Sequence, residues 1–218
     1  MSDAVVGALL WPVITLLQYL RFVVGCVVCL PLLLFSRGNK NFLTLFANLN
    51  CLPLGRYVFS GIVCFYAPYT SSISATVQEL SASGCRITMR DWPWLRNPFS
   101  SIHAIALANF GEFNSGLLMV ALLQNTPKLR GIPIKLTTEY YKKARGCIRA
   151  VCTGPSELSA VSEPCDLEVT SLVYDSNNDL LCKTTVCWTI TVKEHKEHTK
   201  KGGKGGNGKS DSASGKRD

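Results

Sequence analysis

A single acidic side chain stands inside a long apolar stretch in the middle of the chain. Glu112 is the only Asp or Glu between residues 100 and 124. A buried carboxylate without a partner is costly, so Glu112 must have a partner, be protonated or line a cleft. A carboxylate in a cleft can activate water as a general base or attack a carbonyl carbon directly. Glu112 is therefore the first candidate for catalysis, and a buried structural hydrogen bond is the alternative.

Residues near Glu112 could complete such a site. Helical spacing places Ser115 and Gly116 on the same side as Glu112, which predicts a polar, unobstructed patch beside the carboxylate. Backbone N–H groups at a helix N-terminus stabilise a developing oxyanion. The segment Ser100–Ala104 would present that end of the helix.

The segment from Asn97 to Glu112 resembles the signature of hotdog-fold thioesterases, particularly the phenylacetyl-CoA thioesterase-like branch. In that branch an asparagine lies six residues before a histidine and an acidic residue lies nine after it. Asn97, His103 and Glu112 match both intervals. Glu139–Gly146 (EYYKKARG) is similar to the strand and turn that follow the central helix in these proteins. The resemblance covers roughly residues 55–193 and is nearest to an uncharacterised subgroup.

This resemblance implies an acyl-CoA thioesterase that needs no cofactor or metal. Glu112 would be the base or nucleophile and water the second substrate. Asn97 would orient the thioester or the water, and His103 would contribute mainly its backbone. The residues alone also allow structural interpretations, in which Asn97 is a loop or cap residue and His103 a hydrogen-bonded histidine near a helix start. Hotdog proteins resemble one another in forming clefts across a two-fold interface, so we expect a homodimer or a subunit of a larger membrane assembly.

One departure from the family pattern supports a second hypothesis. The family's histidine is usually followed by two glycines, which let the substrate approach the backbone, but here Ala104 and Ile105 follow. The alternative is a non-catalytic hotdog module that acts as a structural or lipid-binding subunit of an organellar membrane complex.

A group of basic residues lies in the Glu139–Gly146 segment. Lys142, Lys143 and Arg145 could bind the phosphates of CoA at the mouth of a cleft, because cationic side chains suit a multiply charged ligand. Ordinary solvent-facing side chains are the alternative interpretation.

The surrounding periodicity predicts the elements that position these residues. Residues 71–91 alternate as a β-hairpin, residues 100–124 are apolar on nearly every face, as in a buried helix, and four strand-like stretches follow. Those stretches are 132–144, 146–153, 165–175 and 180–193, with the polar turn Asp175–Asp179 between the last two. The order predicts an α+β domain over residues 70–193, with an antiparallel sheet wrapped around a long central helix. The resemblance implies that this domain has the hotdog fold.

The N-terminal segment, residues 1–36, is predicted to anchor the chain in a membrane. Residues 4–35 are apolar apart from Arg21, and a bilayer span needs about 20 such residues. A single tilted span and a hairpin both remain open. Arg37 and Lys40 follow the run, so the positive-inside rule places the soluble domain in the cytosol or the mitochondrial matrix. The ten scattered cysteines are expected to be reduced, in agreement with that orientation.

Two further segments flank the predicted domain. Residues 37–69 predict a connector of short helices that either lie at the membrane surface or pack over one end of the domain. Residues 194–218 are rich in Lys, Gly and Ser and predict a disordered basic tail, which could touch anionic lipid. Lysines without interleaved aromatic residues do not favour nucleic acid. His195 and His198 lack further metal-ligand residues on ordered structure, so we interpret them as incidental.

Overall fold

The computed structural model describes Leu16 and residues 41–192. Apart from Leu16, the predicted segments 1–36 and 194–218 lie outside the described residues, so the membrane anchor and the disordered tail stay predictions. The helices are α2 (Phe42–Asn50), α3 (Gly55–Tyr66), α4 (Pro68–Ser71) and α5 (Ala104–Asn125), with short 3-10 helices at Pro93–Leu95 and Ser156–Ala160. The strands are β1 (Thr76–Ser81), β2 (Gly84–Arg90), β3 (Leu129–Tyr140), β4 (Cys147–Thr153), β5 (Cys165–Tyr174) and β6 (Leu180–Val192).

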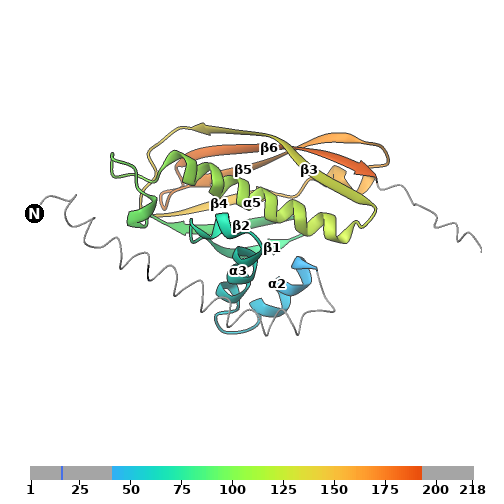
Figure 1. Ribbon diagram of the computed structural model, residues 1–218, viewed down its shortest axis with the longest axis horizontal. Helices are drawn as coiled ribbons and strands as arrows, with labels where there is room; N and C mark the ends of the chain where they lie inside the picture. Colours follow the sequence, from blue (N-terminus) through green and yellow to red (C-terminus); the bar gives the residue numbers. More distant parts are fainter. Residues whose placement is uncertain (1–15, 17–40, 193–218) are drawn as a thin grey trace, which may run out of the picture.

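The six strands form one antiparallel sheet in the order β1-β2-β4-β5-β6-β3 (Figure 1). The hairpins β1–β2 and β5–β6 are those that alternation and polar turns predict from the sequence. Strand β3 is the last element before β4 in the chain, yet it pairs with β6 at the far edge of the sheet. The connection through α5 therefore runs from β2, near one edge of the sheet, to β3 at the other edge.

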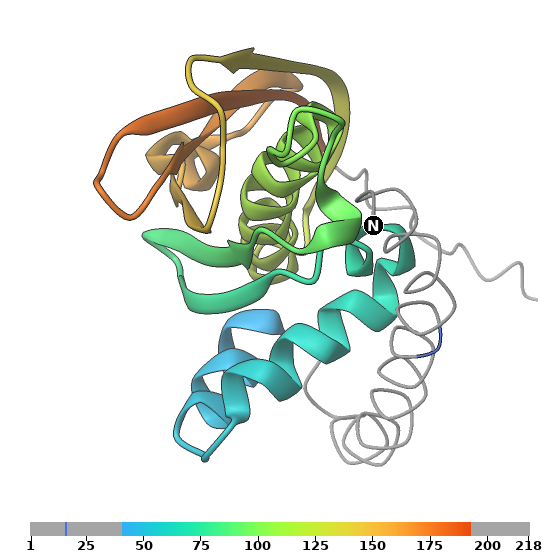
Figure 2. The ribbon, with the colours of Figure 1, turned by 90° about the vertical axis from the view of Figure 1, so that its left-hand side faces the viewer.

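Helix α5 lies against the concave face of this sheet, which curls around it (Figure 2). Apolar side chains point from α5 to nearly all sides, and Phe110, Leu118 and Met119 are fully buried. Among the described helices, α5 is long and apolar enough to cross a membrane, but most of it is buried inside the fold. A helix that is apolar all round is expected in such an interior position.

The two edges of the sheet differ in what covers them. Helices α2 and α3 pack beside β1, and the Ser60 hydroxyl on α3 accepts a hydrogen bond from the backbone N–H of Val77 (2.8 Å). Strand β3, at the opposite edge, is exposed along most of its length and carries the large apolar side chains of Ile132, Ile134 and Leu136. One edge is therefore capped by the chain itself, and the other is bare among the described residues.

The connector predicted over residues 37–69 does form short helices, and these pack over one end of the domain. Phe42 and Phe46 of α2 meet Phe59 of α3 edge to face. The backbone N–H of Phe42 also donates to Gln124 Oε1 at the end of α5 (2.8 Å). This packing agrees with one of the two alternatives, and contact with a membrane stays a prediction.

Helix α5 and strand β3 each have one end at a different residue than the sequence predicts, for local reasons. Helix α5 begins at Ala104 and not near residue 100, because Ser100 has a left-handed backbone (φ 56°) and His103 is the N-cap. Strand β3 ends at Tyr140 and not at residue 144, because the N–H groups of Tyr141 and Lys142 both donate to Leu181 O and leave the ladder.

The cysteines of the described residues are free thiols, as the sequence predicts. Cys152 and Cys182 are buried on the strands, and burial raises the pKa of each thiol to about 12. These thiols are therefore packing groups and not reactive nucleophiles.

Candidate active site

The loop before α5 is built around the side chain of Asn97. Its Oδ1 accepts hydrogen bonds from the backbone N–H groups of Phe99 (3.0 Å) and Ser101 (3.2 Å) and from the Ser101 hydroxyl (3.2 Å). The carbonyl end of the Asn97 amide is thus committed to the loop, which is the structural role that the residue type allows. Its predicted contact with substrate would have to use Nδ2 and stays a prediction.

The first turn of α5 carries the backbone donors expected of an oxyanion site. His103 caps the helix, because its Nδ1 accepts from Ile105 N–H (3.1 Å), while its own N–H donates to Leu95 O (2.7 Å). The N–H groups of Ala104 and Ala106 have no hydrogen-bond partner within the described part of the chain. Ala104 is exposed, so its N–H is the more accessible of the two.

Tyr140 ties the end of the edge strand β3 to the start of α5. Its hydroxyl donates to Ala104 O (2.8 Å), and desolvation by burial is the main cause that raises the pKa of this phenol. The sequence pattern placed Tyr140 in the Glu139–Gly146 segment but did not single it out. No periodicity in the chain predicts this contact, because the two residues meet only when β3 crosses to the far edge of the sheet.

Glu112 lies on α5 as a half-buried carboxylate. Burial raises the pKa of this group above its ordinary value, and no hydrogen bond or ion pair holds its side chain within the described residues. Gly116 makes room for it, because a Cβ at that position would lie 3.0 Å from Glu112 Oε1. The carboxylate is therefore neither sealed in packing nor neutralised by a base.

Ser115 does not join Glu112 at this surface, although helical spacing predicted that it would. Ser115 is fully buried, and its hydroxyl donates to the carbonyls of Gly111 (3.2 Å) and Glu112 (3.1 Å) in the preceding turn. Serine hydroxyls inside helices commonly bond backward in this way. Of the predicted patch, only Gly116 accompanies the carboxylate.

Glu112 and the Ala104 N–H are too far apart to act together in one copy of the chain. They are eight residues apart on α5, which corresponds to about 12 Å along the helix axis. A nucleophile and an oxyanion donor must both lie about 3 Å from the reacting group. A single copy therefore presents the two groups as halves of a site.

The predicted basic group divides into two parts. Lys142 forms ion pairs with Asp175 (3.1 Å) and Asp179 in the β5–β6 turn. Its hydrogen bonds to Asp179 and Asp175 raise the pKa of the Lys142 ammonium, and they hold this turn against the end of β3. Lys143 Nζ instead lies 5.9 Å from the centre of the Phe99 ring, and Arg145 Nη2 donates to Phe99 O (3.3 Å). Phe99 is 72% exposed next to the start of α5, and the sequence analysis did not identify it.

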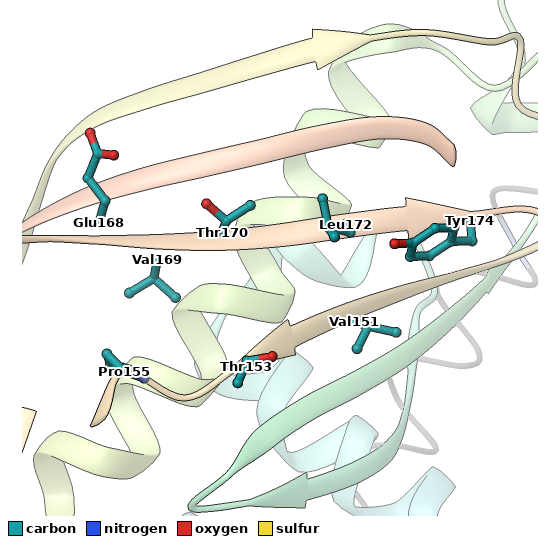
Figure 3. A pocket seen from close by; sticks show the side chains of 8 residues that line it. All are labelled: Val151, Thr153, Pro155, Glu168, Val169, Thr170, Leu172 and Tyr174. Carbon is teal, nitrogen blue, oxygen red and sulfur yellow. The ribbon is translucent and has the colours of Figure 1, made fainter. Parts of the chain in front are cut away.

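A separate cavity of about 400 Å³ lies over β4 and β5 (Figure 3). Thr170, Leu172 and Tyr174 line it, and they alternate along β5 with the buried residues Ser171 and Val173. Alternation sends these two sets to opposite faces of the sheet. The cavity thus opens mainly on the face away from α5 and includes none of the predicted site residues.

A curled antiparallel sheet around one long helix, with a polar loop at the helix start, is the hotdog fold. The fold is similar to that of a crystal structure described as a genomics target, at 24% identity and a TM-score of 0.60, covering 70% of this chain and 99% of that one. It is also similar to a Pseudomonas aeruginosa protein of unknown function described as a probable thioesterase, at 15% identity and a TM-score of 0.55, covering 65% and 97%. At these identities the likeness shows the fold.

The chain belongs to the family described as a domain of unknown function, DUF4442, whose model matches residues 55–190. The likeness to the solved structures confirms the predicted hotdog fold, and the branch that the sequence resembles is unresolved. No curated protein matches the chain. The matched region begins at Gly55, so α3 belongs to it together with the sheet and α5.

Proposed function

We propose that this protein hydrolyses acyl-CoA thioesters at a membrane surface, with Glu112 as the general base or nucleophile. The observation that carries the proposal is the half-buried Glu112 carboxylate, which has no partner among the described residues and lies over Gly116. A desolvated carboxylate is a stronger base than one in water, so the raised pKa suits abstraction of a proton from water near neutral pH. The hotdog fold and its likeness to a protein described as a probable thioesterase support this class of reaction.

The second catalytic group is the Ala104 N–H, acting from another copy of the chain. Because this N–H lies about 12 Å along α5 from Glu112, one copy cannot place both groups on one carbonyl. We propose a two-fold dimer in which Glu112 of one copy lies near the helix start of the other. Strand β3, with exposed Ile132, Ile134 and Leu136, is the surface that such a dimer would bury.

The nucleotide end of CoA is proposed to rest on Phe99, Lys143 and Arg145. An exposed aromatic ring can stack with adenine, and the two cations suit its phosphates. Their place beside the first turn of α5 puts them at the mouth of the proposed cleft. Lys142 is left out of this role, because Asp175 and Asp179 already neutralise it.

The decisive experiment tests the full chain, supplied with vesicles, against acyl-CoAs from acetyl to palmitoyl. Turnover that Glu112→Gln lowers about 100-fold or more is expected if the carboxylate acts as base or nucleophile. Glu168→Gln is the matched control, because Glu168 is exposed on the outer face of β5. Equal loss in both variants, or full activity in Glu112→Gln, would contradict the proposal.

A second assay tests the CoA contacts. Lys143→Ala and Arg145→Ala should raise KM for acyl-CoA and leave KM unchanged for the matching acyl-pantetheine, which lacks the nucleotide. Lys142→Ala should not discriminate between the two substrates. If all three variants behave alike, the proposed division of the basic residues is wrong.

One observation favours the alternative, a non-catalytic lipid-binding or structural hotdog module. His103 occupies the Ile105 N–H, and the Ile105 side chain is 58% exposed where the family's second glycine would leave open backbone. Absence of turnover across the whole panel, with the fold intact by circular dichroism, would support this alternative.

A further inference from the structure

Helix α3 has an apolar face that the domain does not cover. We define the α3 outer face as Leu52, Leu54, Tyr57 and Phe65, of which Leu54 and Tyr57 are 72% and 63% exposed. Tyr57 and Phe65 are eight residues apart, so they share one side of the helix, and Leu54 is the residue that precedes its first turn. The opposite side, with Phe59, Ile62 and Val63, is buried in the core. Helix α3 is thus apolar on two sides but covered on one.

The turn that begins this face holds a leucine in an unfavourable conformation. Leu54 has a left-handed backbone (φ 61°), which residues other than glycine rarely adopt. The turn is tight, since a Cβ at Gly55 would lie 1.7 Å from Leu49 O. This backbone carries Leu54 with its side chain exposed next to exposed Leu52. Two leucines at the tip of a helical hairpin are poorly suited to water.

The charged residues that precede α3 in the sequence, together with Arg56, indicate the nature of its partner. No Asp or Glu occurs between Asp3 and Glu79, and the charged residues in that interval are Arg21, Arg37, Lys40 and Arg56. Such a segment is attracted to anionic lipid headgroups. Arg56 does not obstruct the face, because it bonds to Asn50 Oδ1 (2.8 Å) and Gln78 Oε1 (3.2 Å) on the domain side.

The sequence also limits how far α3 can lie from a bilayer. The apolar run ends at Phe35 and α2 begins at Phe42, so the intervening chain reaches at most about 25 Å. Tyrosine is enriched at membrane interfaces, where its ring meets the acyl region and its hydroxyl meets water. A helix with apolar side chains on its outer face and basic residues nearby is suited to lie in the interface plane.

We propose that the α3 outer face lies on the lipid bilayer and fixes the orientation of the domain there. This inference rests on the predicted anchoring of residues 4–35 in a membrane and is independent of whether Glu112 catalyses a reaction. The occupant is the lipid surface, with Leu52 and Leu54 inserted among acyl chains and Tyr57 at headgroup level.

Two tyrosines of α3 supply a matched probe. Tyr57 and Tyr66 are each 63% exposed, and their nine-residue spacing places them on opposite sides of the helix, about 180° apart. The full chain is reconstituted in phosphatidylcholine–phosphatidylserine vesicles and labelled by hydroxyl radicals, with mass spectrometry as the readout. Tyr57 should be labelled several-fold less than Tyr66. Equal labelling of the two residues in vesicle-bound protein would overturn the proposal.

Two controls separate other causes of protection. In nanodiscs that hold one copy each, protection of Tyr57 should persist, and its loss would assign the face to a second copy of the chain. Flotation of the chain with the vesicles tests the predicted anchor by itself. Failure to float therefore rejects the anchoring on which the inference rests, and it leaves the hydrolysis assay with acyl-CoA unaffected.

Discussion

Two polar residues on the same helix have opposite surroundings. Glu112 is half-buried and lacks a partner among the described residues, whereas Asn114 is fully buried and bonds to the Ser171 hydroxyl of β5 (2.9 Å). With its amide turned over, Asn114 also reaches Cys85 O on β2 and the backbone N–H of Cys152 on β4. The two residues are about 200° apart around the helix. Asn114 joins α5 to three strands, and the Glu112 carboxylate has no partner within the described residues.

The difference extends along the two sides of α5. The sheet side carries Gly111, Asn114 and Ser115, and the side chains of Asn114 and Ser115 are hydrogen-bonded within the fold. The open side carries Ala104, Ile105 and Glu112, and there both an N–H and a carboxylate are unpaired within the described residues. Satisfied polar groups specify a structure, whereas unpaired ones are expected where a ligand binds.

The largest expected effect concerns the two proposed catalytic groups of the open side, the Glu112 carboxylate and the Ala104 N–H. Ala104→Pro removes the proposed oxyanion donor, and proline is tolerated at the first position of a helix. His103 already has the extended backbone (φ −63°, ψ 139°) that a following proline requires. The variant should keep the native melting temperature and lose about 10²–10³-fold in kcat. Ala104→Ser, which keeps the N–H, is the control.

Mixing this variant with Glu112→Gln tests whether two chains share one cleft. Each variant alone lacks one group in both clefts, but a mixed dimer would contain one intact cleft. Equimolar co-expression should restore about a quarter of the wild-type activity, since half of randomly formed dimers are mixed. No restoration would show that both groups act within one chain, or that the dimer does not form.

On the sheet side, Asn114→Leu should lower stability without acting on the chemistry directly. The change removes the side-chain partner of the buried Ser171 hydroxyl, at about 1–3 kcal/mol, together with the contacts that the turned-over amide makes to Cys85 O and Cys152 N–H. We expect the free energy of unfolding in urea to fall by about 2–4 kcal/mol. An unchanged free energy of unfolding would show that the hydrogen bonds of Asn114 do not stabilise the fold. The contrast between Asn114 and Glu112 would then not be one between a paired and an unpaired polar group.

Two glycine substitutions sharpen the contrast further. In Gly111→Ala the new Cβ would lie 2.3 Å from Thr184 Oγ1 and 2.5 Å from its Cβ, so overpacking should cost about 1–3 kcal/mol. In Gly116→Ala the new Cβ meets only the flexible end of Glu112, and better helix propensity should add about 0.5–1 kcal/mol. Gly116→Ala should nevertheless lower kcat, because it moves the carboxylate. Thermal unfolding measures the effects on stability, and the acyl-CoA assay measures the effect on kcat. Equal destabilisation by Gly111→Ala and Gly116→Ala would contradict the assignment of Gly111 to the sheet side of α5 and of Gly116 to the side of Glu112.

The smallest effect is the pH dependence of Glu112. Its folded-state pKa is raised by burial, so the native state holds a proton that the unfolded state has released. The stability that this proton gives to the folded protein is fully present below the unfolded-state pKa of Glu112. It is lost as the pH rises through the folded-state pKa. Glu112→Gln should therefore match the wild type in acid and become the more stable protein toward neutral pH. Urea unfolding across that range, with Glu168→Gln alongside, measures the difference.

Several features of the fold could be predicted from the chain because they depend on local patterns. Alternation over residues 71–91 and the polar turn at Asp175–Asp179 gave the two hairpins, and the all-round apolar stretch around Glu112 gave the buried helix. The Asn97–His103–Glu112 spacing indicated a loop residue, a histidine near the start of the helix and a carboxylate on the helix, but not that His103 is the N-cap. Short-range periodicity and motif spacing are enough for such features, since neighbouring residues share one element.

Contacts between distant segments were decided by the tertiary structure alone. Tyr140 reaches Ala104 only because β3 pairs at the far edge of the sheet, and Ser115 turns inward because α5 is covered on that side. The separation of Lys142 from Lys143 likewise depends on where the β5–β6 turn folds back. The sequence by itself determined which residues could carry charge or chemistry. Packing decided which of them remain unpaired, because burial and partners come from elements far apart in the chain.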